Sequence, residues 1–140
     1  MNEQINAQQL AEKMQQAVNS RDAAMQVALY AEDAIYYEAS QVVRGREAIQ
    51  ELYTVWYQAF PDVTSEFWNI MSCGEYFIYE GTTRGTHTGP LATPEGEVLP
   101  TGRKIEIRFA FIAKMSPEGL IQEDRTYFDS ALMMQQLGLG

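Results

Sequence analysis

The stretch RKIEIRFAFIAK, residues 103–114, alternates apolar and charged side chains along most of its length. Successive side chains of a β-strand point to opposite faces, so this alternation predicts a strand with two different faces. The apolar face holds Ile105, Ile107, Phe109, Phe111 and Ala113. The other face holds Lys104, Glu106, Arg108 and Lys114. We therefore expect a sheet that packs on a core with one side only.

Further strands are predicted on both sides of this stretch. They are DAIYYEAS (33–40, before a turn at Gly45), TSEFWNIMS (64–72), EYFIYEGTTRGTHTG (75–89) and LIQEDRTYFD (120–129). The segment 64–72 is rich in aromatic and β-branched residues, which favour strands. The turn SPEG separates the last two strands of the chain.

Helical spacing of apolar residues dominates the first part of the chain. Residues 7–18 predict one helix, and the break NSRD at 19–22 predicts the start of a short second one. A third helix is predicted over 46–60, ending before Pro61, and a short terminal helix over 130–138. Helices followed by a run of strands predict an α+β fold rather than an alternating α/β fold.

One long connection stands out in this strand-rich part. PLATPEGEVLPTG, residues 90–102, is rich in proline and glycine and predicts a loop. Loops of this length often act as lids or rims of functional sites.

The length of 140 residues predicts a single domain spanning 1–140, and 46% hydrophobic residues suit a globular core. The formal net charge is −9. Nucleic-acid-binding proteins carry basic patches, and anionic lipids attract basic segments, so neither kind of partner is expected.

Cys73 is the single cysteine and His87 the single histidine. A cysteine without a partner predicts a buried thiol in a reducing compartment. The polar start MNEQINAQQL has no hydrophobic signal region, and no apolar run suffices for a transmembrane helix, so a cytoplasmic location is expected. Without CxxC or HExxH motifs, a protein-built zinc site is not expected.

Several segments occur in an order that carries a resemblance: YAEDAIYYEAS, VRGREAIQEL, GTHTGPL, PTGRKIEIRFAFIAK, GLIQEDRTYFD and LMMQQLG. Together they resemble the SnoaL-like polyketide cyclase (ester cyclase) family, within the nuclear-transport-factor-2-like, ketosteroid-isomerase-like superfamily. The resemblance covers about residues 7–138. It implies a cone-shaped α+β barrel, in which a curved, mostly antiparallel sheet wraps around the N-terminal helices. It also implies a homodimer formed through the outer face of the sheet.

The same resemblance implies a reaction and a ligand class. Members close a ring on a polyketide ester by intramolecular aldol condensation, with no metal and no organic cofactor. A carboxylate takes a proton α to a carbonyl of a small hydrophobic molecule. The resemblance places this acid/base at Asp124, within EDRTYFD. A carboxylate partly desolvated among aromatic residues gains a pKa suited to that task. The alternation of this strand leaves open whether Asp124 faces a pocket or the solvent.

His87, between Gly85 and Gly89, is a second catalytic candidate, as a hydrogen-bond donor to an enolate or as a base. The alternative is a strand histidine bonded to a neighbouring strand or to a chain terminus. Tyr36 and Tyr37 are candidates to polarise a carbonyl or to pack under the sheet. The large aromatic residues are expected in the core or in an apolar pocket wall that binds the substrate: Trp56, Phe60, Trp68, Phe109 and Phe111.

Two other charged features have simpler interpretations. Asp129 precedes the terminal helix and is expected to cap it. Glu106 and Arg108 have the spacing of the arginine–carboxylate pair of the epoxide hydrolase branch of the superfamily. They alternate against the apolar face, however, so we expect them on the outer surface of the sheet. There they would pair with each other, with strand neighbours such as Glu80 or Arg84, or across a dimer interface.

Three functions therefore remain open. The first is a cofactor-free cyclase or isomerase that acts on a hydrophobic carbonyl compound by proton transfer to a carboxylate. The second is a non-catalytic small-ligand-binding or dimerisation domain. The third is an epoxide hydrolase-like or hydratase-like enzyme that activates water.

Overall fold

The structure is a computed structural model that describes residues 5–39 and 41–140. Its helices are α1 (Ala7–Asn19), α2 (Ala23–Val27), α3 (Arg46–Ala59) and α4 (Ser130–Gln136). Its strands are β1 (Tyr30–Glu38), β2 (Gln41–Arg44), β3 (Thr64–Cys73), β4 (Tyr76–Thr86), β5 (Leu91–Thr93), β6 (Gly96–Val98), β7 (Lys104–Met115) and β8 (Ile121–Phe128).

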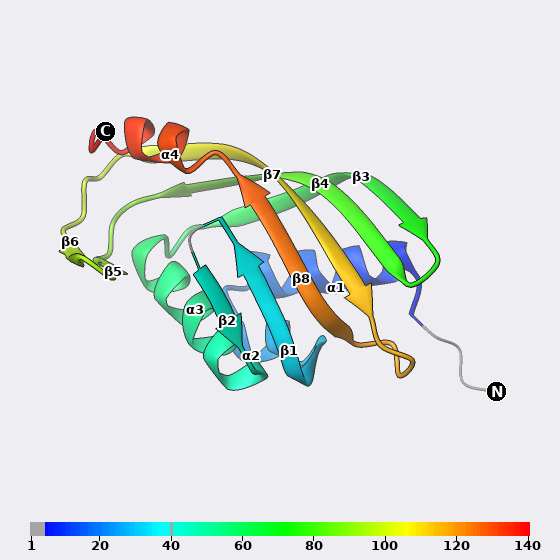
Figure 1. Ribbon diagram of the computed structural model, residues 1–140. Coiled ribbons are helices and arrows are strands. Elements are labelled where there is room, and N and C mark those ends of the chain that lie inside the picture. The colour runs from blue at the N-terminus through cyan, green and yellow to red at the C-terminus, as the bar shows by residue number, and fades with distance from the viewer. Residues whose placement is uncertain (1–4, 40) are drawn as a thin grey trace.

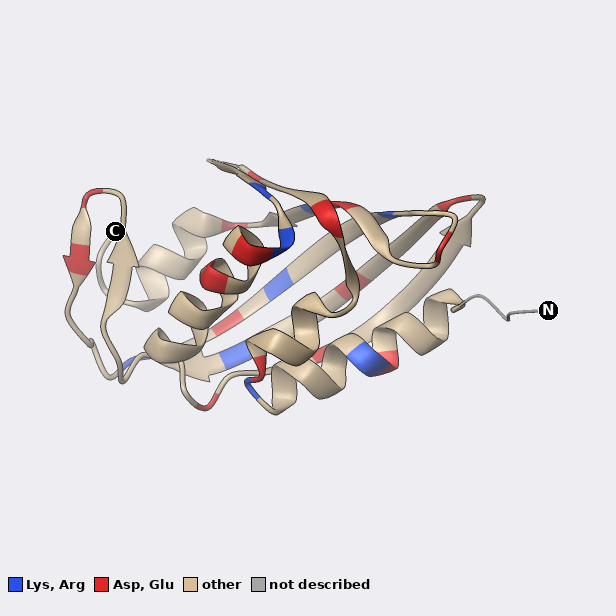
Figure 2. Ribbon diagram, turned by 90° about the horizontal axis from the view of Figure 1, so that it is seen from below, with Lys and Arg blue, Asp and Glu red and all other residues tan. Residues whose placement is uncertain are grey.

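Six strands form one curved sheet in the order β2-β1-β8-β7-β4-β3 (Figure 1). Neighbours pair antiparallel except β1 and β8, which run parallel. Helices α1, α2 and α3 cover one face of the sheet, as the view from below shows (Figure 2). The predicted α+β class, with a mostly antiparallel sheet around N-terminal helices, is confirmed.

The core lies between this sheet and the helices. On α1 the buried side chains recur at helical spacing: Ala7, Leu10, Ala11, Met14, Ala17 and Val18. A capping box between Asn6 and Gln9 fixes the start of that helix. On β7, Ile105, Ile107, Phe111 and Ala113 are buried while Lys104, Glu106 and Arg108 are exposed, so the two predicted faces are confirmed. Exposed Glu106 pairs with Arg84 at 2.8 Å, on the outer surface as expected.

Some local predictions were wrong. The strand predicted at 33–40 begins at Tyr30, and its last residue, Ser40, lies outside the described residues. Strand β2 was not predicted, and the predicted loop 90–102 contains the short hairpin β5–β6. Cys73 is exposed rather than buried, because it ends an edge strand beside the β3–β4 turn.

The exit from β4 is anchored to the end of α3. The backbone N–H groups of Thr88 and Gly89 both donate to the Ala59 carbonyl, at 3.2 and 3.1 Å. A Cβ at Gly89 would lie 1.8 Å from the Gln58 carbonyl oxygen. Only glycine therefore fits this crossing of two backbones.

Gly89→Ala is expected to lower the free energy of unfolding by about 1 to 3 kcal/mol, because backbone must move to admit the methyl group. Urea unfolding measures the effect. Gly140→Ala is the control, since a Cβ there would meet no atom closer than 3.4 Å. Equal stability of the Gly89 variant and the wild type would contradict the close approach.

Candidate active site

Asp124 faces the inside of the sheet. The parallel pairing of β1 with β8 sets Tyr36 beside Asp124, and the antiparallel pairing of β7 with β8 sets Ala113 beside it. All three residues are buried, with Asp124 only 2% exposed. The face of the last strand that alternation left open is therefore settled: Asp124 and Thr126 point inward, and Glu123 and Arg125 lie on the other face.

Hydroxyl groups from three elements surround this carboxylate. The Tyr30 hydroxyl, at the start of β1, donates to Oδ2 of Asp124 at 2.5 Å. The Thr126 hydroxyl donates to Oδ1 at 2.7 Å. The hydroxyl oxygens of Tyr30 and Tyr53 are 2.7 Å apart, and Tyr53 comes from α3. A buried carboxylate with both oxygens bonded is thus held in one orientation.

The electrostatics of this cluster favour a base beside neutral phenols. Burial raises the pKa of Asp124 to about 6, against the hydrogen bonds from Tyr30 and Thr126, which lower it. Burial also raises the pKa of Tyr30, Tyr36 and Tyr53 well above the ordinary value of 10.0. Near neutral pH the phenols are therefore donors, while Asp124 titrates close to the pH at which a general base works best.

Tyr36 and Tyr37 lie on opposite faces of β1. Tyr36 is buried, and its hydroxyl donates to Glu38 at 3.1 Å. Tyr37 lies on the outer face, where the Arg125 guanidinium sits 4.3 Å from the centre of its ring. The prediction that both tyrosines reach a pocket or pack under the sheet is therefore wrong for Tyr37, since the alternation of the strand separates them.

His87 lies beyond the end of β4 and is fully buried. Its ring packs against Phe60, with centroids 5.3 Å apart. The backbone N–H of Thr101 donates to Nδ1 at 3.2 Å, so Nδ1 carries no proton and the neutral ring is protonated at Nε2. Within the described part of the chain, buried Nε2 has no hydrogen-bond partner.

The structure does not bring His87 and Asp124 into contact. Tyr53 on α3 belongs to the Asp124 cluster, whereas Phe60, the residue that caps the end of α3, contacts His87. Phe60 follows Tyr53 by seven residues. At a rise of 1.5 Å per residue this is about 10 Å along the helix. The two candidates thus occupy different parts of the interior.

Burial lowers the pKa of His87 below its ordinary value of 6.5. We expect its titration midpoint below 6.5 and, above that midpoint, a ring protonated at Nε2. Nitrogen-15 NMR checks both, and a single histidine makes the assignment unambiguous. A midpoint above 6.5 would contradict the burial of the ring, and a proton on Nδ1 would contradict the hydrogen bond from the Thr101 N–H.

Four of the five predicted aromatic wall residues face the interior. Phe60 and Phe111 are buried, and Trp56 and Phe109 are partly buried against the core. Trp68 does not belong with them. Trp68 directly follows Phe67, which packs against the core, so alternation places its ring on the outer face, where it is 48% exposed and donates to Thr82.

Sequence reasoning missed Tyr30 and Tyr53. Tyr53 lies on the predicted apolar face of its helix, so a hydroxyl group on that face was the available signal. Tyr30 lies before the predicted start of its strand, so the sequence held no signal for its role. Asp129 was predicted correctly, since its side chain accepts from the Leu132 N–H at the start of α4.

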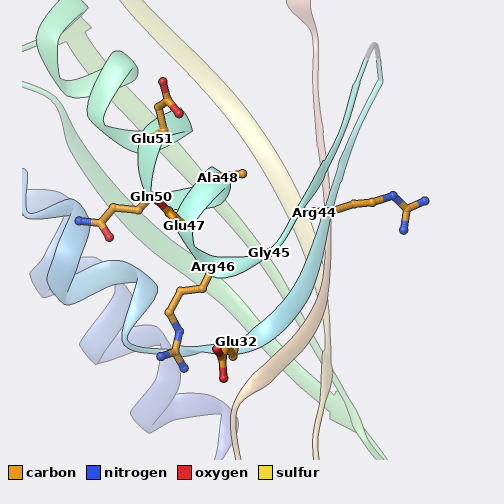
Figure 3. Close-up of a pocket in the computed structure, with 8 residues that line it drawn as sticks. All are labelled: Glu32, Arg44, Gly45, Arg46, Glu47, Ala48, Gln50 and Glu51. Atoms are coloured by element: carbon orange, nitrogen blue, oxygen red, sulfur yellow. The ribbon is translucent and has the colours of Figure 1, made fainter.

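An open pocket of about 650 Å³ lies outside this cluster, at the start of α3 (Figure 3). Its lining is polar and includes Glu32, Arg44, Arg46 and Glu47, but none of the predicted site residues. Arg46 donates to the Tyr30 carbonyl at 3.0 and 2.5 Å. The pocket thus borders the backbone that carries Tyr30.

Residues 5–39 and 41–140 contain no group of three His, Cys, Asp or Glu side chains that could hold a metal ion. The same residues include no helix long and apolar enough to cross a membrane.

The fold and its interior together define an α+β barrel protein with a buried carboxylate, Asp124, on the inner face of the sheet. The model of the SnoaL-like polyketide cyclase family matches residues 8–137, and the chain belongs to this family. No curated protein sequence matches the chain.

Solved structures show the same fold. IdmH from Streptomyces antibioticus, a proposed polyketide cyclase, is 25% identical with a TM-score of 0.77 over 96% of this chain and 99% of its own. AclR from Streptomyces galilaeus, a proposed hydroxylase, is 21% identical with a TM-score of 0.79 over 96% and 85%. SalBIII, an epoxide hydrolase/cyclase-like enzyme in salinomycin pyran ring formation, is 19% identical with a TM-score of 0.72 over 89% and 92%.

Proposed function

We propose that this protein is a cofactor-independent enzyme that removes a proton α to a carbonyl in a small hydrophobic molecule, with Asp124 as the base. The observation that carries the proposal is the buried Asp124 carboxylate, its pKa raised to about 6 beside phenol donors. Strongly perturbed pKa values cluster at functional sites, so this observation favours a proton-transfer role over a purely ligand-binding domain.

In the proposed chemistry one proton moves from the substrate to Asp124 and later returns to the product. The proton of the substrate Cα–H bond moves to Asp124, and the electron pair of that bond forms the enolate. In a cyclisation, the enolate carbon attacks a second carbonyl of the same molecule, and the proton returns from Asp124 to the new alkoxide. In an isomerisation, the proton returns to another carbon. Aldol cyclisation of a polyketide-like ester is the member of this class that we favour, given the family.

The aromatic wall residues and His87 extend the proposal. Trp56, Phe60, Phe109 and Phe111 offer the apolar contacts that a hydrophobic substrate needs. His87, with its unpartnered Nε2–H, would donate to an oxygen far from the reacting carbon rather than act beside Asp124.

The proposal also includes a homodimer and a cytoplasmic location. Large side chains are exposed on the outer face of the sheet, where a second copy would cover them: Trp68, Met71, Tyr76 and Tyr127. Sedimentation of the protein as a monomer would remove the dimer from the proposal.

Exchange of α-protons in D₂O tests the chemistry, with methyl esters of aromatic β-keto acids as probes and proton NMR as the readout. Because the base must be ionised, the enzyme-dependent rate should rise with pH to a plateau, with a midpoint near 6. The proposal would be rejected if no probe exchanged above background, or if the enzyme-dependent exchange rate were independent of pH between 5 and 8.

A water-activating enzyme is the second candidate. It needs a second polar group near Asp124, and Glu38 qualifies, since its charge raises the pKa of Asp124. The similarity to SalBIII is consistent with this alternative. Hydrolysis of styrene oxide that depends on both carboxylates, without any α-proton exchange, would favour it.

A further inference from the structure

Tyr30 stands between two oxygen partners but has one proton to give. Its hydroxyl lies 2.5 Å from Oδ2 of Asp124 and 2.7 Å from the hydroxyl of Tyr53. While Asp124 is ionised it can only accept, so the Tyr30 proton goes to Asp124. Tyr53 must then donate to Tyr30. In this state both phenol protons are used inside the cluster, and Tyr53 has none left for a ligand.

The number of protons available to Asp124, Tyr30 and Tyr53 changes when Asp124 takes up a proton. The three groups then hold three protons for the same two hydrogen bonds. A proton on Oδ2 donates to Tyr30, Tyr30 in turn donates to Tyr53, and the Tyr53 proton is left over. The leftover donor is a phenol at the less buried end of the row, since Tyr53 is partly exposed while Tyr30 is 0% exposed.

We propose that Tyr53 is a catalytic hydrogen-bond donor: proton uptake by Asp124 reverses the two hydrogen bonds through Tyr30 and turns the Tyr53 hydroxyl toward the enolate oxygen. Tyr30 is a positioning residue in this scheme, since it acts through Asp124 and Tyr53. The inference rests on the proposed function for the identity of the substrate oxygen, but the reversal of the bonds belongs to the protein alone.

The reversal has a catalytic consequence. The substrate bears negative charge on oxygen only after its proton has moved to Asp124. The Tyr53 donor becomes available in that same state and not before. An interaction made only as charge develops stabilises the transition state more than the bound substrate, which raises the rate rather than the affinity.

The second oxygen of Asp124 offers a competing place for the proton. A proton on Oδ1 would face Thr126 and would leave the Tyr30 bond unchanged. A phenol is a stronger donor to an anion than an aliphatic alcohol, so an enolate at Tyr53 favours the Oδ2 position.

Neighbouring ionisable groups must be considered in any test that varies pH. Tyr30, Tyr36 and Glu38 face Asp124 from β1, and Tyr53 faces it from α3. The neighbour on β7 is the apolar Ala113. The raised pKa values of the tyrosines keep them protonated below pH 8, which leaves Asp124 and the neighbouring carboxylate Glu38 as the acidic side chains that the test must distinguish.

The test is a carbon-13 NMR titration from pH 4 to 8 of protein labelled at tyrosine Cζ and aspartate Cγ. We expect the Tyr53 Cζ shift to follow the midpoint of Asp124. In Tyr30→Phe the Tyr53 response should vanish, while Asp124 still titrates, at higher pH because it has lost a hydrogen bond. A Glu38→Gln variant should keep the Tyr53 response, which excludes Glu38 as its source.

Tyr57→Phe is the matched control. Its ring stacks on Tyr53 with centroids 6.4 Å apart, but its hydroxyl donates to Gln26 outside the row. It should leave the Tyr53 response unchanged. A Tyr53 shift that is flat while Asp124 titrates, or that persists in Tyr30→Phe, overturns the reversal, as does an Asp124 that does not titrate in this range.

A ligand measurement tests the donor role of Tyr53. The probe is 4-nitrophenolate, which resembles an enolate in its planar anionic oxygen, with nitrobenzene as the neutral comparison. Tyr53→Phe should weaken nitrophenolate binding tenfold or more and leave nitrobenzene binding unchanged. The donor role of Tyr53 is overturned if wild type and variant bind nitrophenolate with equal affinity, or if neither binds it detectably. Neither measurement needs turnover, so a protein that passes both but fails in α-proton exchange refutes the proposed function and not the reversal.

Discussion

Asp124→Asn is expected to slow α-proton exchange by about 10²- to 10⁴-fold, the usual contribution of a positioned general base. The amide cannot accept the substrate proton. It nevertheless preserves the surroundings, because its oxygen can accept from Tyr30 and its NH₂ group can donate to the Thr126 oxygen. Exchange rates in D₂O at pH 8, on the plateau, measure the loss.

Asp129→Asn provides the control for this substitution. It makes the same chemical change five residues along the chain, at the N-cap of α4, where asparagine caps as well as aspartate. Its exchange rate should equal that of the wild type. An Asp124→Asn variant that exchanges at the wild-type rate would remove Asp124 from the mechanism.

The same substitution is expected to make the protein more stable at high pH. The pKa of Asp124 rises from 3.8 in an unfolded chain to about 6 in the folded protein, chiefly by burial. The folded state therefore binds its proton more tightly, and stability falls as pH rises from about 4 through 6. The difference corresponds to about 3 kcal/mol, all of it lost above pH 6. Asparagine carries no charge and escapes this loss.

Urea unfolding at pH 4 and pH 8 checks this prediction. The stability of Asp124→Asn relative to the wild type should increase from pH 4 to pH 8 by about 3 kcal/mol, within a factor of two. Asp129→Asn should show no such increase. If the stability of Asp124→Asn relative to the wild type is unchanged or lower at pH 8, then ionisation of Asp124 does not destabilise the folded protein.

These two expected results have opposite signs for one residue. A group that costs stability and is retained is typical of a functional site. The cost arises from burial, and the same burial raises the pKa of Asp124 to about 6, which the proposed proton transfer requires. A substitution that removes the stability cost therefore also removes the carboxylate with the raised pKa.

The faces of β7 could be predicted because one face is apolar and the other charged. The face of β8 could not, because polar side chains occur on both: Asp124 and Thr126 inside, Glu123 and Arg125 outside. Only pairing with β1 and β7 decides between them. Alternation also cannot reveal the bulge between Phe67 and Asn69, and one extra residue reverses the side of every position beyond it.

The hydrogen-bond partners of Asp124 could not be predicted from the sequence for a related reason. Tyr30 and Asp124 are 94 positions apart in sequence, and their hydrogen bond exists only once two distant strands lie in register. Tyr53 was expected on the buried side of its helix, which is correct, but what its hydroxyl meets there depends on the same strand pairing. The family resemblance supplied Asp124, whereas the phenols around it came from the geometry.

The parallel pairing of β1 with β8 has a further consequence for how the protein is made. Helix α3 and strands β2 to β7 all lie between β1 and β8 in the sequence, so the ribosome adds every one of these elements after Tyr30 and before Asp124. Contacts this distant in sequence close a long loop and form late. A growing chain therefore carries Tyr30 without its carboxylate partner, and the Tyr30–Asp124 hydrogen bond forms only when β8 docks beside β1.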